Sequence, residues 1–320
     1  MKHNQTQTHP RGAAAFSAAR ALALAAFATL AAAGAPATAT AAGTATAAGA
    51  GAPTLEHPFV GTYRREAQQG MAIHKDTAFL FNNTGIVRMY NLKTQEFIND
   101  YLLDTAAPEN HVNCANFGVE FPEGNSAYPA LYVSECYGQR RCFVQNVSAA
   151  GAKLIQTLKV RRDGKNMKPL TADYSFDWYV DKDGKSLYFA AITHDAKNRT
   201  DESDYLITKV RLPALSEGDV TFTEKDFLDQ FTIRFRHLSQ GGVIRGDRLY
   251  LPVGCLKPAG AKKDPADRAL IVVDLGKRKI EKIMDFSKDL TLEPEDADFH
   301  GDKLLMVCGQ DGGLWRIKGI

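Results

Sequence analysis

The stretch Thr77-Ala78-Phe79-Leu80-Phe81 has four counterparts along the chain, and this recurrence decides the fold. The counterparts are Ala130-Leu131-Tyr132-Val133, Ser186-Leu187-Tyr188-Phe189, Arg248-Leu249-Tyr250-Leu251 and Lys303-Leu304-Leu305-Met306. Measured between the central leucines, the successive steps are 51, 56, 62 and 55 residues. A repeat of about 40–50 residues with several strands in each unit is typical of a β-propeller, and the longer steps here predict loop insertions.

Each repeated strand has neighbours that complete a unit. A strand precedes it, at Gly70–His74, Cys114–Phe121, Phe176–Asp181, Gly241–Arg245 and Asp296–His300. A third strand follows, at Ile86–Leu92, Tyr205–Leu212, Leu270–Leu275 and Leu314–Ile317. A fourth follows in most units, at Glu96–Leu103, Leu154–Val160, Val220–Thr223 and Ile280–Phe286. These runs are rich in β-branched and aromatic residues and are bounded by Gly, Asp or Asn, which is the pattern of strands and turns.

The last unit reaches Ile320 after its third strand, while Phe59–Glu66 is a strand with no unit of its own. Pairing this segment as the outer strand of the last unit would close the ring and remove exposed edges. We therefore predict an all-β fold, a five-bladed β-propeller closed by an N-terminal strand. A six-bladed propeller and an irregular β-sandwich are the alternatives. The best helix candidate is Glu224–Gln230, one short turn at most.

The N-terminal segment, residues 1–41, has the pattern of a secretory signal peptide. It has no acidic residue, it carries Lys2, Arg11 and Arg20, and its apolar run is Ala21–Ala33. That run is shorter than the ~20 residues that span a bilayer. A disordered Ala-rich tail is the alternative. Residues 42–57 are predicted to be a flexible Ala/Gly/Thr linker, and residues 58–320 the propeller, in a secreted or periplasmic protein.

Charge and motifs exclude several classes of function. After residue 41 the chain has 36 basic and 37 acidic residues, which does not suit a protein that coats nucleic acid or anionic lipid. We expect no transmembrane anchor after signal cleavage, and a monomer. The sequence has no phosphate-binding loop, dinucleotide fingerprint or serine-nucleophile motif.

Polar residues recur where the innermost strands begin and where the second strands end. Counting back nine residues from Ala78, Leu249 and Leu304 gives Gln69, Gln240 and Glu295. Because one face of a propeller collects these positions from every blade, we predict a polar ligand site at the axis. Its predicted residues are Gln69, Asn82, His111, Asn113, Asp177, Trp178, His194, Gln240, Glu295, Asp296 and Asp311. The alternative is a channel whose polar groups hold only water.

Two chemistries are conceivable at this face. Asp177 and Glu295 could act as an acid–base pair if burial separated their pKa values, and His111 and His194 are further catalytic candidates. Asn113, Asp177 and Glu295 could instead supply hard oxygen ligands to Ca²⁺. Glu293 and Asp298 are interpreted as parts of a solvated acidic turn around Pro294.

The cysteines suit an oxidising compartment only in part. Cys136 and Cys142 flank a five-residue loop between strands, so we predict a disulfide across that hairpin. Cys255 and Cys308 occupy near-equivalent blade positions and are either a second disulfide or two small buried residues. Cys114 has no recognisable base beside it that would make it a nucleophile.

The segments Gln69-Gly70-Met71-Ala72 and Glu293-Pro294-Glu295-Asp296, with the blade repeat, resemble secreted propellers of the gluconolactonase-like and glutamine cyclotransferase-like groups. The resemblance covers residues 59–320 at the level of architecture. The gluconolactonase-like enzymes imply a divalent cation on Glu295, Asn113 and Asp177. Two hypotheses follow: a propeller that binds a small polar molecule, glycan or protein partner at its axial face, or an extracellular hydrolase or lyase that uses axial carboxylates.

Overall fold

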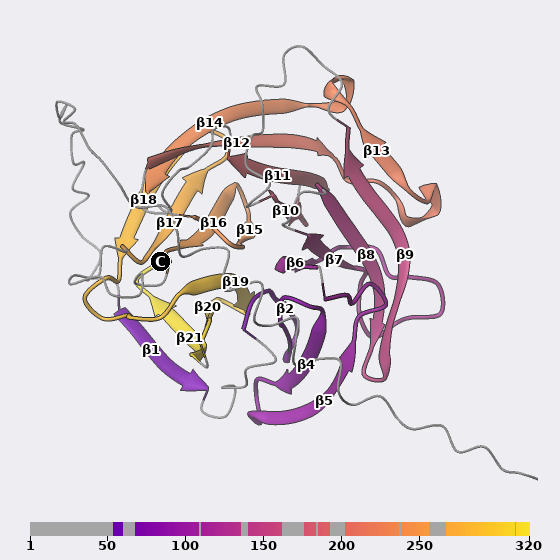
Figure 1. Ribbon diagram of the computed structural model, residues 1–320, viewed down its shortest axis with the longest axis horizontal. Helices are drawn as coiled ribbons and strands as arrows, with labels where there is room; N and C mark the ends of the chain where they lie inside the picture. The colour runs from indigo at the N-terminus through magenta and orange to yellow at the C-terminus, as the bar shows by residue number, and fades with distance from the viewer. Residues whose placement is uncertain are drawn as a thin grey trace, which may run out of the picture. The chain divides into compact units, whose positions relative to one another are not determined.

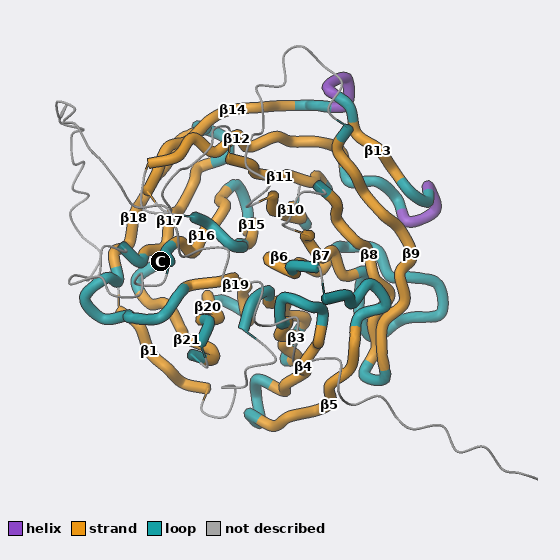
Figure 2. Tube along the Cα trace, viewed as in Figure 1, coloured by secondary structure: helices purple, strands orange, loops and turns teal. Residues whose placement is uncertain are grey.

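Five sheets surround a common axis in the computed structural model, which describes residues 54–59, 68–108, 110–135, 140–161, 176–183, 185–192, 202–236, 238–255, 267–310 and 312–320 (Figure 1). Each sheet contains four antiparallel strands, and one sheet has a fifth that pairs in parallel. From the axis outwards the strands follow sequence order, except in the sheet whose outermost strand is the N-terminal one. The predicted five-bladed β-propeller is therefore confirmed. Strands dominate the described residues, and the helical segments there are two short 3-10 turns, Leu215–Glu217 and Glu224–Asp226 (Figure 2).

The blades follow one another along the chain. Blade 1 contains β2 (Met71–His74), β3 (Thr77–Phe81), β4 (Ile86–Asn91) and β5 (Glu96–Leu102). Blade 2 contains β6 (Val112–Phe117), β7 (Leu131–Glu135), β8 (Arg141–Ser148), β9 (Gly151–Val160) and the added β13 (Val220–Phe222). Blade 3 contains β10 (Phe176–Asp181), β11 (Ser186–Ile192), β12 (Glu202–Arg211) and β14 (Asp229–Arg236). Blade 4 contains β15 (Val243–Arg245), β16 (Arg248–Val253), β17 (Ala269–Asp274) and β18 (Lys279–Asp285). Blade 5 contains β19 (Pro294–His300), β20 (Lys303–Cys308), β21 (Gly313–Lys318) and β1 (Thr54–Phe59).

The core consists of five hydrophobic clusters, one between each pair of neighbouring blades. A strand near the axis has a blade on either side, so both of its faces are covered. Consequently β7 and β11 are buried at every residue, whereas β5 and β18 in the outermost position are largely exposed. This explains why the repeated second strands are continuous apolar runs rather than alternating ones.

The ring closes through the N-terminal strand, as predicted. β1 pairs antiparallel with β21, with Thr54 opposite Lys318 and Phe59 opposite Leu314. The strand is Thr54–Phe59, not the predicted Phe59–Glu66, and it begins inside the predicted linker of residues 42–57. Residues 60–67, the predicted signal peptide and the rest of the linker lie outside the described residues.

The long third step arises from an insertion that the sequence analysis assigned wrongly. Val220–Thr223 was predicted to be the fourth strand of blade 3, but β13 pairs in parallel with β9 and extends blade 2. The fourth strand of blade 3 is β14, which overlaps the predicted helical turn Glu224–Gln230. The helical part is one 3-10 turn, at Glu224–Asp226, where Asp226 accepts a hydrogen bond from the Thr223 backbone N–H. β-propensity alone does not distinguish the two possible partners of a short strand.

The carboxylate of Asp296 connects four inner strands at the axis. One of its oxygens accepts the backbone N–H of Met71 at 2.8 Å and that of Ala115 at 3.0 Å. The other accepts the N–H of Gly242 at 2.6 Å and that of Ala297 at 2.8 Å. Asp296 thereby links blades 1, 2 and 4 to its own blade 5, and it is fully buried.

Further side chains join the inner strands in the same way. The Asn116 amide accepts the N–H of Val180 and donates to the carbonyl of Gly242. The Ser134 hydroxyl accepts the N–H of Trp178, and Asp298 accepts the N–H of Ile73. The inner strands are too far apart for a backbone ladder between blades, so side chains satisfy their buried N–H groups.

Replacing Asp296 with Ala should strongly destabilise the protein. Three cross-blade N–H groups would remain buried without an acceptor, at about 1–3 kcal/mol each, against a total stability of about 5–15 kcal/mol. Asp296→Asn keeps one acceptor oxygen and should lie between wild type and Ala. Urea unfolding measures the order, and Asp289→Ala at an exposed loop position is the control. Equal midpoints for Asp296→Ala and Asp289→Ala would contradict this role.

Candidate functional site

The inner strands begin on one face of the ring, which we call the start face. There the chain brings together residues that are far apart in sequence. The backbone at Gly70 lies beside the backbone carbonyl of Asn113. Asn113 in turn bonds to Asp177, and Gln240 bonds to Glu293. At the start face these contacts join polar residues of blades 1, 2 and 3 in one group and polar residues of blades 4 and 5 in another.

Asn113 and Asp177 form the centre of this cluster. Both side chains are almost fully buried, and the Asn113 amide nitrogen donates to an Asp177 carboxyl oxygen at 2.7 Å. Burial raises the pKa of Asp177 to about 7, and the contacts with Asn113 and Tyr179 oppose that rise. The Tyr179 hydroxyl is near the carboxyl group without a hydrogen bond of ordinary geometry. Asp177 is consequently a carboxyl group that exchanges its proton near neutral pH.

Two acceptor atoms at this face lack a partner. The Asn113 side-chain oxygen and the Gln69 side-chain oxygen are both buried, and neither has a hydrogen-bond partner in the described part of the chain. They belong to neighbouring blades, and Gly70 next to Gln69 lies against Asn113. A buried acceptor without a donor costs about 1–3 kcal/mol, so each such atom calls for an explanation.

The other side of the start face is acidic, with one buried arginine. Gln240 donates to a Glu293 oxygen at 2.8 Å. The Glu295 carboxylate lies so close to Gly309 that a Cβ there would clash with it. The Arg268 guanidinium is buried and donates through Nε to the carbonyl of Leu292 at 2.7 Å. This part of the face is a rigid polar wall rather than an open acidic patch.

The contacts do not fit the predicted calcium site. In the described ranges, no group of three or more His, Cys, Asp and Glu side chains could hold a metal ion. Asn113 also presents its amide nitrogen, not its oxygen, to Asp177. A hard cation needs several converging oxygens, so we derive no step through calcium.

Several predicted site residues have structural roles. Asn82 accepts the backbone N–H of Ile86 at 2.8 Å and so stabilises the β3–β4 turn. Trp178 packs in the hydrophobic cluster between blades 2 and 3, with its ring near Phe176 and Phe189, so its role is in the core. Asp296 uses both oxygens to join the inner strands.

Of the remaining predicted site residues His111, His194 and Asp311, the structure describes only His111. His111 directly precedes β6 on the start face and is half-buried. His194 and Asp311 lie outside the described residues, as does Cys136. The candidate acid–base pair therefore stays with Asp177 and Glu295, of which Asp177 is hydrogen-bonded to the neighbouring blade.

The prediction of a Cys136–Cys142 disulfide was wrong, because Cys142 is a free thiol. Cys142 is a fully buried free thiol in the core between blades 2 and 3, opposite Ser134 in the ladder. Cys308 is also a buried free thiol, so no disulfide joins it to Cys255, and the burial alternative for that pair is confirmed. Cys114 lies 3.4 Å from the Gly242 carbonyl oxygen, and burial holds its pKa well above the ordinary thiol value.

Sequence reasoning missed some members of the cluster. Glu293 and Asp298 were interpreted as solvated, yet they are 8% and 2% exposed and make contacts between blades. Arg268 was not predicted, because a single arginine before a strand is common and carries no distinguishing pattern. The signal that could have found Asp298 is its spacing of two residues from Asp296 along β19, which points both side chains to the same side of the strand. Glu293 precedes the strand, and no such spacing marks it.

No protein-family model matches the chain, and no curated protein matches its sequence. Solved structures with a related arrangement include the glutaminyl cyclase of Myxococcus xanthus, at 10% identity and a TM-score of 0.45, over 79% of this chain and 90% of that one. Another is Kuenenia stuttgartiensis hydrazine synthase, at 12% identity and a TM-score of 0.39, over 75% of this chain and 73% of that one. A third is Saccharomyces cerevisiae Sqt1, at 8% identity and a TM-score of 0.35, over 76% of this chain and 55% of that one. These likenesses are at the level of architecture and assign no activity to this chain.

The raised pKa of Asp177 predicts a pH dependence. From about pH 4 to about pH 7 the unfolded chain has lost this proton while the folded protein retains it, so Asp177 lowers stability as pH rises. The loss across this window is about 4 kcal/mol. Asp177→Asn should therefore gain stability relative to wild type as pH rises, and the difference should level off above about pH 7. Urea unfolding at several pH values measures it, with Asp289→Asn as control; parallel curves for Asp177→Asn and wild type would contradict the shift.

Proposed function

We propose that this protein is an exported binding propeller whose start face takes up a small polar ligand that donates hydrogen bonds. The observation that carries the proposal is the pair of buried acceptor atoms, on Gln69 and Asn113, that have no partner in the described part of the chain. Asn113 also contacts Asp177, a third group able to accept a hydrogen bond. A ligand with several donors would satisfy buried acceptors that the protein itself leaves unmatched.

The chemistry favours a hydroxyl-rich ligand. The named polar groups at the start face are mainly carboxylates and amides, and the buried Arg268 already donates to the Leu292 carbonyl. A saccharide or polyol offers many O–H donors without a charge that must be desolvated. Fixed blades hold these acceptors in place, so little entropy is lost when a ligand binds.

Gln69→Leu tests this function in the full protein. The change removes one acceptor and leaves the Asn113–Asp177 pair intact, so binding of neutral sugars should weaken about tenfold, equivalent to about 1.4 kcal/mol. Calorimetry with glucose, galactose and N-acetylglucosamine is the measurement. Gln230→Leu on outer strand β14 is the matched control, because the same substitution there lies far from the axis. No binding of any sugar, or equal affinities for both variants, would contradict the proposal.

A second candidate function is acid–base chemistry on the same ligand. It is favoured by Asp177, whose pKa of about 7 suits a group that gives and takes a proton near neutrality. Asp177→Asn would then abolish conversion of a bound ligand while leaving binding largely intact. If wild type and Asp177→Asn bind the ligand with equal affinity and wild type converts none of it, acid–base catalysis is contradicted and only the binding function remains.

Export predicts a processed chain. The described residues contain no helix long and apolar enough to span a membrane. If residues 1–41 are a signal peptide, the protein recovered outside the cytoplasm should begin near residue 42. Intact-mass measurement of that fraction tests this, and replacing Leu22, Leu24 and Leu30 with Asp should retain the unprocessed chain in the cytoplasm. Full-length chain starting at Met1 in both fractions would contradict export by this route.

A further inference from the structure

A cavity lies between blades 4 and 5, at the face where the inner strands end in tight turns. We call this side the turn face and the cavity the turn-face cleft. It has a volume of about 420 Å³ and is bordered by the ends of β15, β19 and β21. The inner strands separate it from the start face by roughly 15–20 Å. It is therefore independent of the site proposed above.

Aromatic rings form one wall of the turn-face cleft. Tyr250 and Phe299 meet edge to face, with ring centroids 5.1 Å apart. The Arg245 guanidinium lies 4.5 Å from the Phe299 ring centroid, and it donates to the carbonyl of Gly301 at 2.9 Å. Both contacts fix the guanidinium against the ring, so a cation and a flat apolar surface are presented together.

The cleft carries an excess of positive charge. Four basic side chains line it, Arg245, Lys303, Arg316 and Lys318, against the single acid Asp302. Glu56 on β1 neutralises part of this positive charge, because its carboxylate oxygen lies 3.0 Å from Lys318 Nζ and 3.8 Å from Arg316 Nη1. Counting both acids leaves two more positive than negative side chains. Lys303 makes no ion pair within the described ranges, and it is exposed.

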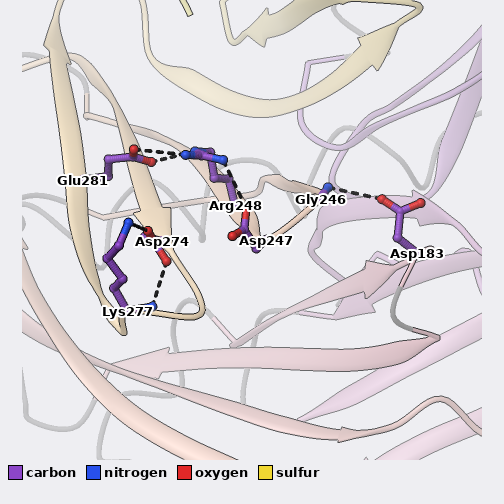
Figure 3. A network of polar contacts seen from close by, with 7 residues as sticks. All are labelled: Asp183, Gly246, Asp247, Arg248, Asp274, Lys277 and Glu281. Carbon is purple, nitrogen blue, oxygen red and sulfur yellow. Dashed lines mark hydrogen bonds and ion pairs between the residues drawn. The ribbon is translucent and has the colours of Figure 1, made fainter.

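The neighbouring cavity between blades 3 and 4 is different. It is larger, about 580 Å³, and acids outnumber bases in its lining: Asp181, Asp183, Asp229 and Asp247 against Lys209 and Arg278. Arg278 pairs with Asp229 at 3.0 Å, and Asp183 accepts the N–H of Gly246. Around it Arg248 bonds to both Asp247 and Glu281, and Lys277 bonds to Asp274 (Figure 3). The lining of that cavity is therefore acidic and does not suit an anion, whereas the lining of the turn-face cleft is basic.

We propose that the turn-face cleft binds a small anion carried on a ring, such as a phosphorylated or carboxylated sugar. The ring packs on Phe299 beside Tyr250, and the anionic group contacts Arg245, Lys303 and Arg316. The volume suits one such molecule, since small-ligand sites measure about 300–1,000 Å³. Charged hydrogen bonds to guanidinium and ammonium groups give preference for the anion over the neutral sugar.

Calorimetry on the full protein tests the proposal with glucose 6-phosphate, glucuronate, inorganic phosphate and glucose. Both ring-bearing anions should bind at least tenfold more tightly than glucose, and the ratio of their affinities distinguishes phosphate from carboxylate as the preferred group. Raising the salt concentration should weaken both. Glucose binding as tightly as the anions at this cleft, or no binding of either anion, overturns the proposal.

Two variants locate the binding. Lys303→Glu should weaken both ring-bearing anions at least tenfold, while Lys279→Glu on the outer strand β18 makes the same charge change elsewhere and should have no effect. Phe299→Leu should lower the affinity for glucose 6-phosphate towards the affinity for inorganic phosphate. Gln69→Leu at the start face should leave anion binding unchanged. Equal effects of Lys303→Glu and Lys279→Glu would show that general charge, not this cleft, holds the anion.

Discussion

Both oxygens of Asp296 are occupied by backbone N–H groups from inner strands that are up to 225 residues apart in the chain. Neighbouring blades pack through side chains and form no backbone ladder at the axis, so the N–H groups that face it need other acceptors. Burial raises the pKa of Asp296 well above its ordinary value, and the surrounding N–H donors oppose that rise. The geometry of the inner ring, and with it the start face, depends on this carboxyl group.

The neighbouring carboxyl groups differ in how completely the fold uses them. Asp298 accepts two backbone N–H groups at the far end of β19, and Asp296 accepts four. Asp177 accepts from one side chain, Asn113, which itself keeps an oxygen without a donor. Groups whose bonds are complete hold the ring together, and groups whose bonds are incomplete are the ones with capacity to bind something else.

The two proposed sites also differ in chemistry because of where they lie. At the start face the polar atoms come from inner strands, are buried and are mainly acceptors, which suits an uncharged donor ligand. At the turn-face cleft the charges belong to strand ends and hairpin turns on the rim, where long basic side chains stay hydrated. An anion can approach them there without the cost of burying an unpaired charge.

The sequence alone determined the repeat, the blade count, the closure of the ring by an N-terminal segment, though not the bounds of that strand, and the positions where inner strands begin. These are local properties, because apolar runs and turn residues are written at regular spacing along the chain. It therefore predicted that Gln69, Asn113, Asp177, Gln240 and Glu295 share one face. It failed at the insertion, where Val220–Phe222 had two possible neighbours, and only packing selected β9.

Tertiary structure alone decided which polar residues are structural and which are available. Asp177 and Asp296 look alike in sequence, each an acid within an inner strand, yet one bonds to a single amide and the other to four backbone groups. Trp178 and Cys142 likewise proved to be core residues. The turn-face cleft was not predicted, since its members come from separate turns of blades 4 and 5. Burial and hydrogen-bond partners depend on contacts between distant blades, and no local pattern records them.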